Sequence, residues 1–152
     1  MKIKDIIKEA VIINEEATFH DAIELMVKKQ TNSLLVTNED GILVGEVKVS
    51  DLLDAIVPEY LDGDSIAANF ATEEMFDEAV QNATLKPVSE FMTVDIQPVH
   101  VDDSLMSIAA TAIAHQTAHI AIVDHENMPI GVVSRRGLKH ILAKYLNIPD
   151  SA

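Results

Sequence analysis

Along the first part of the chain, apolar residues recur with two different spacings, one typical of a helix and one typical of strands. Over residues 19–27 the apolar positions recur every three or four residues, as on the buried face of a helix. Thr18 precedes this stretch and Asp21 follows three residues later, a capping-box arrangement that marks the start of the helix. The other elements expected here are strands at residues 11–13, 34–37 and 42–47 and a helix at residues 51–57.

The same order of elements occurs a second time further along the chain. A shift of 86 residues places Val44-Gly45-Glu46-Val47 on Ile130-Gly131-Val132-Val133 without a gap. We expect the first helix of this copy to begin at Asp102 or Asp103, because a carboxylate is favourable at the positive end of a helix. The other elements expected here are strands at residues 96–99, 120–123 and 130–133 and a helix at residues 138–146. The sequence therefore predicts two β-α-β-β-α repeats.

The segment between the repeats is strongly acidic. The expected division is repeat 1 at residues 1–57, a linker at 58–86, repeat 2 at 87–146 and a tail at 147–152. Residues 59–84 contain seven Asp and Glu and no Lys or Arg, and their apolar residues have roughly helical spacing. We therefore expect one or two amphipathic helices, whose apolar stripe packs on the protein or on a partner subunit. A helix that only supports the structure is the favoured interpretation.

Composition excludes several classes of function. The 152 residues include 11 Lys and Arg against 25 Asp and Glu, for a net charge of −14, so binding to nucleic acid polymers is not expected. There is no cysteine, and hence no disulfide, thiolate metal site or thiol nucleophile. No apolar stretch approaches the roughly 20 residues of a membrane span, so no membrane insertion is expected. The beginning of the chain has no signal-peptide pattern, and we expect a cytoplasmic protein.

Two matching stretches connect the chain to a known family. Residues 40–53 and 128–138 each run from a turn through Gly and alternating apolar residues into a helix, and each repeat has an apolar pair in front, Ile6-Ile7 or Phe91-Met92. This architecture resembles the tandem CBS domain, or Bateman module. The resemblance implies an α/β fold of two β-α-β-β-α repeats with pseudo-two-fold packing, joined here by the acidic helical linker.

The resemblance also implies regulation rather than catalysis. CBS pairs typically bind AMP, ADP, ATP or S-adenosylmethionine in clefts between the repeats and modulate a partner protein, such as an enzyme or a transporter. Family members commonly form flat dimers through helical faces. We therefore expect a homodimer whose contact surface includes the helices near residues 19–29 and 105–114 and the terminal helices. No catalytic residue, required cofactor or metal site is expected.

The binding motif of the family, Gly-hydrophobic-x-hydrophobic-Thr/Ser-x-x-Asp, is incomplete in both repeats. The first repeat has Lys48 at the hydroxyl position and keeps Asp51, which by family analogy binds ribose hydroxyls. The second repeat keeps Ser134, whose hydroxyl would contact phosphate or ribose, but has Gly137 at the Asp position. Each departure removes one of the contacts that the family pattern implies.

Each of these residues also has a structural interpretation. Asp51 is suited to cap its helix, and this role and ligand contact are not exclusive. Lys48 is either a cation for phosphate or a solvated surface lysine. Arg135 and Arg136 suit forked contacts with phosphate oxygens. The alternative for these two arginines is ion pairing with the acidic linker, and we favour the anion site.

The remaining candidate site residues are implied by the resemblance, from their positions in the family pattern. Ile96, Pro98 and Val132 would wall an adenine pocket, although their pattern alone is typical of a core strand. His119 would face the cleft and touch phosphate. His115 and His119 have the spacing of a metal pair on a helix, but Thr117-Ala118 should end the helix between them, so a metal site is disfavoured.

Two functions remain open at this point. The leading hypothesis is a regulatory CBS pair that binds an adenosine compound. The rival is a dimerising, protein-interaction module that has lost nucleotide binding, which the two incomplete motifs and the acidic linker favour.

Overall fold

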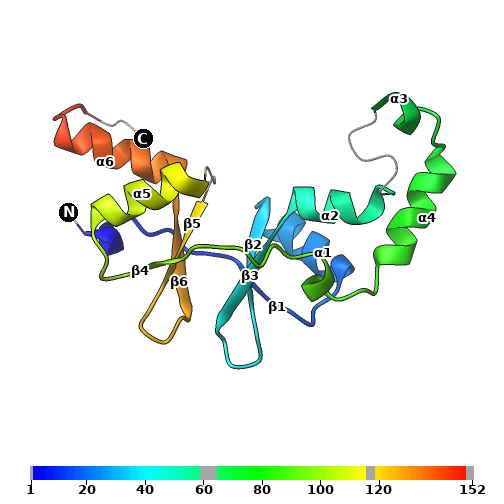
Figure 1. Ribbon diagram of the computed structural model, residues 1–152, viewed down its shortest axis with the longest axis horizontal. Coiled ribbons are helices and arrows are strands. Elements are labelled where there is room, and N and C mark those ends of the chain that lie inside the picture. Colours follow the sequence, from blue (N-terminus) through cyan, green and yellow to red (C-terminus); the bar gives the residue numbers. More distant parts are fainter. Residues whose placement is uncertain (1, 59–64, 116–118, 150–152) are drawn as a thin grey trace. The chain divides into compact units, whose positions relative to one another are not determined.

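A computed structural model describes residues 2–58, 65–115 and 119–149 and shows the mixed α/β fold with two repeats (Figure 1). The elements of the first repeat are β1 (Ile12–Asn14), α1 (Phe19–Lys29), β2 (Ser33–Thr37), β3 (Leu43–Lys48) and α2 (Val49–Ile56). Those of the second are β4 (Val99–His100), α5 (Leu105–His115), β5 (His119–Val123), β6 (Pro129–Ser134) and α6 (Arg135–Tyr145). The β-α-β-β-α order is therefore present twice.

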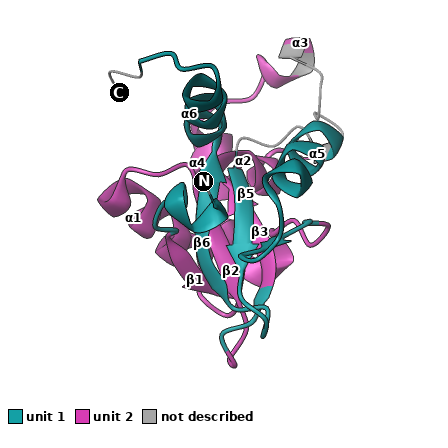
Figure 2. Cartoon of the chain, turned by 90° about the vertical axis from the view of Figure 1, so that its left-hand side faces the viewer, with its two compact units in different colours: residues 1–10, 41–43, 96–152 teal, residues 11–40, 44–95 magenta. Residues whose placement is uncertain are grey.

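The chain packs into two compact units whose boundaries differ from those of the sequence repeats (Figure 2). Unit 1 comprises residues 1–10, 41–43 and 96–152, and unit 2 comprises residues 11–40 and 44–95. The segment in front of the first strand of each repeat thus packs with the other repeat. Its apolar residues explain why: Ile3 is buried in the core of unit 1, and Val88 is buried in the core of unit 2.

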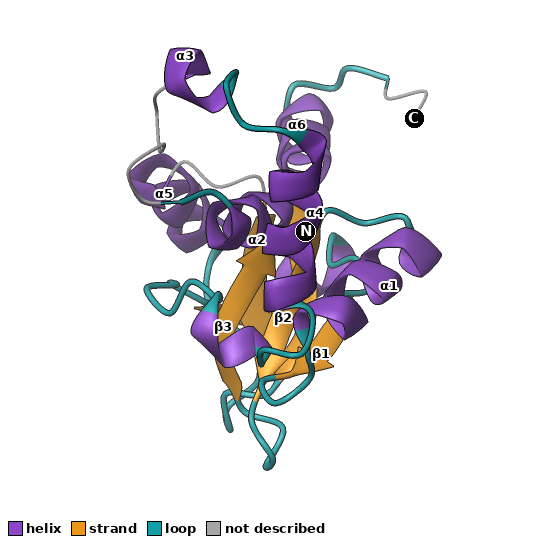
Figure 3. Cartoon of the chain, turned by 90° about the vertical axis from the view of Figure 1, so that its right-hand side faces the viewer, coloured by secondary structure: helices purple, strands orange, loops and turns teal. Residues whose placement is uncertain are grey.

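Each unit contains a three-stranded sheet. In unit 2 the order is β1-β2-β3, with β1 parallel to β2, and the strands lie side by side in Figure 3. In unit 1 the order is β4-β5-β6, with β4 parallel to β5 and β5 antiparallel to β6. The exchanged segments join these sheets by short bridges, Lys8 with Val132 in unit 1 and Thr93 with Glu46 in unit 2. Each bridge has two backbone hydrogen bonds, of 2.8 and 2.9 Å in the first and 2.8 and 3.0 Å in the second.

The glycine of each motif lies where the exchanged segment crosses the sheet. A Cβ atom on Gly131 would overlap the Ile7 side chain and lie 2.6 Å from the Lys8 carbonyl oxygen. A Cβ atom on Gly45 would lie 2.8 Å from the Met92 sulfur and 2.9 Å from the Thr93 carbonyl oxygen. Only glycine lets the two backbones approach this closely. The glycine of the motif therefore serves the exchange of segments.

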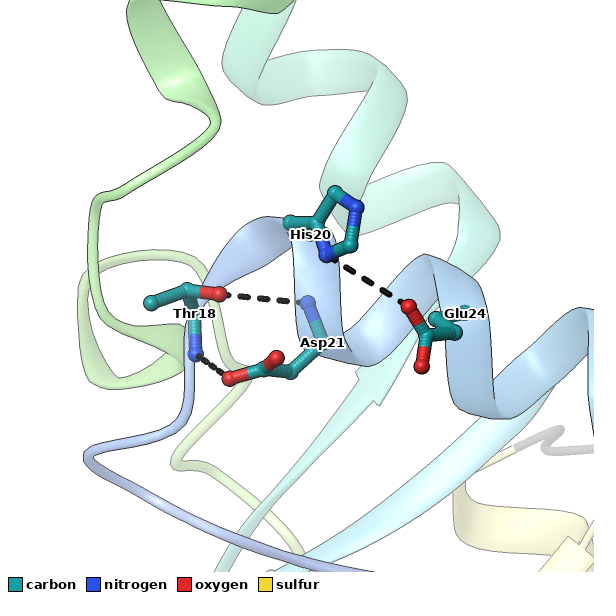
Figure 4. Close-up of polar contacts among 4 residues, drawn as sticks. All are labelled: Thr18, His20, Asp21 and Glu24. Atoms are coloured by element: carbon teal, nitrogen blue, oxygen red, sulfur yellow. Dashed lines mark hydrogen bonds and ion pairs between the residues drawn. The ribbon is translucent and has the colours of Figure 1, made fainter.

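Helix starts follow local capping chemistry, with one correction to the prediction. The predicted capping box of α1 is present: Thr18 Oγ1 accepts from Asp21 N at 3.1 Å, and Thr18 N donates to Asp21 Oδ2 at 3.0 Å (Figure 4). The prediction that Asp102 or Asp103 caps the second repeat's first helix is wrong. Ser104 Oγ accepts from Ser107 N at 3.1 Å instead, while the Asp103 carboxylate accepts from His100 N at 3.1 Å.

Other elements begin a few residues away from their predicted boundaries. The strand expected from residue 96 begins at Val99, since Pro98 has no N–H to donate to a sheet ladder. Assigning Ile96 and Pro98 to a core strand is therefore wrong, and both are half-buried in the chain ahead of β4. The last helix of each repeat begins earlier than expected, directly after Lys48 and Ser134, which are their N-cap residues.

The acidic segment forms the helices α3 (Ser65–Ala68) and α4 (Glu73–Ala83). Thr72 caps α4 by accepting from Met75 N at 3.2 Å. Ala83 is buried, and Ala79 and Val80 pack on the core of unit 2, whereas Phe76 stays exposed. The helix α4 is therefore amphipathic and packs on its own chain. Of the helices that the structure describes, none has both the length and the apolar character to cross a membrane.

Candidate functional site

The strand register of unit 1 gathers several predicted site residues on one face of its sheet. His119 on β5 is the partner of Ser134 on β6, and Lys8 is bridged to Val132. Opposed residues in an antiparallel pair project to the same face, and so do residues two apart on one strand. Lys8, His119, Val132 and Ser134 therefore share a face. The opposite face carries buried apolar residues such as Val133 and forms the core.

A pocket of about 310 Å³ lies where this face meets the start of α6. Its lining residues are Asp5, Ile6, Lys8, Ser134, Arg136, Gly137 and His140. Two of them, Ser134 and Arg136, were predicted from the sequence. Gly137 was named only as the position at which the motif lacks its Asp, and His140 was not predicted. The other three lining residues precede the first strand, and they were missed because nothing local shows that this segment packs on the second repeat. The pocket thus combines side chains from both ends of the chain.

The start of α6 carries more positive charge than helix stability explains. Ser134 Oγ accepts from Gly137 N at 3.2 Å, and the first turn contains Arg135 and Arg136 but no acidic residue. Cations at this end oppose the helix dipole, typically by about 0.3–1 kcal/mol each. In the described part of the chain, no carboxylate forms an ion pair with either arginine or with Lys8. An anion bound here would gain from the helix end and from all three cations.

Burial and two of the same positive charges lower the pKa of His119. Burial is the largest cause of the lowered pKa, and the charges are those of the neighbouring cations Lys8 and Arg135. Because the imidazole is neutral above its pKa, His119 adds hydrogen-bonding capacity to this face without adding charge at neutral pH. A bound anion would reverse the effect of the neighbouring cations and favour the protonated ring.

The corresponding face of unit 2 has the opposite chemistry. Asp51 accepts from the backbone N of Lys48 at 2.8 Å through Oδ2 and from the Thr93 hydroxyl at 3.2 Å through Oδ1. Asp51 is therefore not the N-cap that its structural interpretation predicted, since Lys48 has that position; Asp51 lies in the first turn of α2, accepts from the N-cap backbone, and each of its oxygens has a donor. Burial raises the pKa of the adjacent Glu46; Lys48 opposes this effect and Asp51 reinforces it. Two carboxylates and one lysine make this face unfavourable for phosphate.

The glycine at the acidic position of the second motif is not required by packing. A Cβ atom on Gly137 would lie 3.6 Å from a Val133 methyl group, 3.8 Å from the Ile6 carbonyl oxygen and 3.8 Å from Ser134 Oγ. These are ordinary van der Waals distances, in contrast to those at Gly131. Position 137 therefore has room for a Cβ atom.

The remaining candidates lie outside this pocket. Ile96 and Pro98 belong to unit 1 and are half-buried but do not line it. His115 ends α5 and His119 opens β5, while Thr117-Ala118, expected to end the helix, lie outside the described residues. Over residues 2–58, 65–115 and 119–149, no three His, Asp or Glu side chains gather as a metal site would require.

Comparisons with known proteins agree with this architecture. The uncharacterized protein MJ1426 of Methanocaldococcus jannaschii is 30% identical over 149 residues, covering 91% of this chain and 89% of that protein. The choline transport ATP-binding protein OpuBA of Bacillus subtilis is 26% identical over 134 residues, covering 88% of this chain but 28% of that protein.

Solved structures show the same fold. The CBS-pair protein CBSX2 from Arabidopsis thaliana has a TM-score of 0.74 at 20% identity, covering 97% of this chain and 98% of that chain. A structure of CBSX2 in complex with AMP has a TM-score of 0.68 at 20% identity, covering 95% and 98%. The family model described as CBS domain matches residues 3–58 and 88–144. The chain therefore belongs to the CBS domain family and contains two copies of the domain.

Proposed function

We propose that this CBS pair is a cytoplasmic regulatory module, without catalysis of its own, that binds an adenosine nucleotide in the pocket of unit 1. AMP, ADP and ATP are the first candidates, and S-adenosylmethionine is the adenosyl alternative. The observation that carries the proposal is the meeting of Lys8, Arg136 and the start of α6 at one pocket, with no carboxylate paired to these cations among the described residues. CBSX2, which has the same fold, is known in complex with AMP.

The pocket provides contacts for the phosphate end of such a ligand. The Arg136 guanidinium suits two oxygens of a phosphate at once, and Lys8 provides a second cation. Ser134 is the N-cap of α6 and contributes its hydroxyl beside the first backbone N–H groups of the helix. His119 and Arg135 lie on the adjoining face, and Val132 offers an apolar surface there. Ile96 and Pro98 remain proposed walls for the adenine.

The first motif is a weaker candidate for the same ligand. Lys48 would have to attract a phosphate beside the carboxylates of Glu46 and Asp51, whose negative charge opposes that of the phosphate. Asp51 keeps about two acceptor positions beyond its bonds to Lys48 N and the Thr93 hydroxyl, so the weakness of this motif lies at the phosphate end. We therefore assign the primary site to the second motif.

Regulation requires that the ligand distinguish two states of the protein. A ligand shifts a conformational equilibrium only by its difference in affinity for the two conformations. We propose a homodimer that passes this difference to a regulated enzyme or transporter. Large apolar side chains on the helices expected to form the contact are highly exposed, among them Val27 at 73% on α1 and Met106 and Ile113, each at 78%, on α5. Burying such side chains favours association.

Isothermal titration of the purified protein with AMP, ADP, ATP and S-adenosylmethionine tests the proposal. Arg136→Ala should weaken nucleotide binding about tenfold or more, because a charge-assisted contact is lost. Lys139→Ala is the matched control, since Lys139 is on the same helix but does not line the pocket, and should change affinity little. Asp51→Ala should leave the affinity unchanged. Absence of binding by all four ligands to folded protein would refute the proposal.

A second candidate function rests on the incomplete motifs. With both Asp51 oxygens engaged and no side chain at Gly137, the chain would act as a dimerising interaction module that holds no nucleotide. This alternative predicts a dimer in nucleotide-free buffer, and a protein partner retained under the same conditions. Because both functions include a dimer, a pull-down from nucleotide-depleted extract, read together with the titration above, separates them.

A further inference from the structure

We propose that Asp5 supplies the carboxylate that the second motif lacks at position 137, and that it binds the sugar hydroxyls of the ligand. This inference rests on the proposed nucleotide site and adds a specificity-determining residue to it. Asp5 belongs to neither copy of the motif. It is the last residue of the short helix η1 (Ile3–Asp5), which precedes the first strand and packs in unit 1.

The geometry places Asp5 at the cavity that an acidic residue at position 137 would also reach. Asp5 and Gly137 both line the pocket of about 310 Å³. A Cβ atom on Gly137 would point to within 3.8 Å of the carbonyl oxygen of Ile6, the residue next to Asp5. Asp5 therefore belongs to the lining of the same pocket that an acid at position 137 would enter.

The Asp5 carboxylate has the charge and the acceptor capacity for this role. A backbone hydrogen bond from Lys2 N, 2.8 Å long, lowers the pKa of the Asp5 carboxyl; desolvation opposes this effect, and the positive charges of Lys4 and Lys144 lower the pKa further. That bond uses Oδ2, and an ionised carboxylate has about four acceptor positions in all. No lysine or arginine within the described residues pairs with Asp5. Two hydroxyls of a vicinal diol suit the remaining positions.

The pocket then has two chemically distinct ends. Lys8 and Arg136 recognise a phosphate, and Asp5 recognises hydroxyl groups, so the ligand class is a nucleotide with an intact ribose rather than a simple anion. A phosphate alone would meet the repulsion of Asp5, whereas a ribonucleotide satisfies both ends. In the family motif the Asp that accepts from the ribose hydroxyls lies at the position of Gly137. In this chain we assign that role to Asp5, which lies in the segment of the first repeat that packs with the second repeat.

The test compares ribose and deoxyribose ligands on the full chain. AMP should bind wild-type protein more tightly than 2′,3′-dideoxyadenosine monophosphate. Asp5→Asn should weaken AMP binding about tenfold or more, because hydrogen bonds to a charged acceptor are lost, and should not weaken binding of the dideoxy compound, whose phosphate no longer meets the charge of Asp5. Asparagine keeps a side-chain oxygen for Lys2 N, so the η1 turn should be retained; circular dichroism melting checks this. Adding Gly137→Asp to Asp5→Asn should restore AMP affinity.

Glu90→Gln is the matched control. Glu90 ends the equivalent short helix η3 (Val88–Glu90), which packs in unit 2, and its change should not alter binding. Equal binding of AMP and the dideoxy compound, or an Asp5→Asn variant with unchanged AMP affinity, would overturn the role of Asp5 while leaving the nucleotide site standing. Absence of binding by every nucleotide to wild-type protein would overturn the proposed function and this inference together.

Discussion

A pair of identical substitutions, Gly131→Ala and Gly137→Ala, should change the stability of the protein in opposite directions. Both add one methyl group to unit 1 within seven positions of each other. At Gly131 the added Cβ would overlap the Ile7 side chain and lie 2.6 Å from the Lys8 carbonyl oxygen. At Gly137 the nearest atom would be 3.6 Å away. The comparison therefore isolates the close crossing of the exchanged segment from the general effect of replacing glycine.

The structure sets the expected magnitudes. Overpacking a tight contact costs about 1–3 kcal/mol. The Lys8 carbonyl also accepts from Val132 N at 2.9 Å, so moving it aside weakens a hydrogen bond worth about 0.5–1.5 kcal/mol. We expect Gly131→Ala to lower the free energy of unfolding by about 2–4 kcal/mol. Gly137→Ala should raise it by about 0.5–1 kcal/mol, because alanine is the better residue in the first turn of α6.

Urea denaturation followed by far-ultraviolet circular dichroism measures both effects, with the slope of the transition as a check that the variants unfold the same structure. Gly45→Ala is an informative third variant. Its added Cβ would meet a flexible Met92 side chain as well as the Thr93 carbonyl oxygen. The free energy of unfolding of Gly45→Ala should therefore lie between those of the other two variants. If Gly131→Ala were as stable as wild type, the close crossing of residues 7–8 over β6 would be refuted.

Two further predictions concern the capping of α1 and the pH dependence of unit 2. Thr18→Ala should lower the free energy of unfolding by about 1 kcal/mol, since it removes the acceptor for Asp21 N; Thr18→Ser should restore most of it in the same urea assay. Burial raises the pKa of Glu46, so the folded protein binds this proton more tightly than the unfolded chain and loses that stability as the pH rises through the raised pKa. Glu46→Gln should therefore raise the melting temperature at neutral pH but not at pH values where Glu46 is already protonated, and an equal gain at both would contradict the assigned cause.

Local patterns were sufficient to predict the order of the elements. The three-and-four spacing before Lys28 and the alternation around Gly45 are properties of single segments, and so is the capping box of Thr18. Prediction was less precise where neighbouring residues compete for one role. Asp102, Asp103 and Ser104 are all competent caps, and the outcome depends on which backbone group each side chain reaches.

The site was only partly predictable because it depends on contacts between distant parts of the chain. Ser134 and Arg136 were found from the motif, since they follow its strand directly. Lys8 and Asp5 were missed because no periodicity near them shows that their segment leaves its own repeat and packs on the other. The sequence does show an apolar pair in front of each repeat, Ile6-Ile7 and Phe91-Met92, and in the structure each of these two segments packs with the other repeat.

The exchange of segments also redistributes electrical charge. Among the described residues, unit 1 contains seven Lys and Arg against six Asp and Glu, a balance of +1, whereas unit 2 contains four against fifteen, a balance of −11. Lys2, Lys4 and Lys8 enter unit 1 only because residues 1–10 cross to it. At physiological ionic strength electrostatic fields decay over about 8 Å. The net charge of −14 for the whole chain therefore does not describe the local charge of unit 1, which by itself carries a balance of +1 among its described residues.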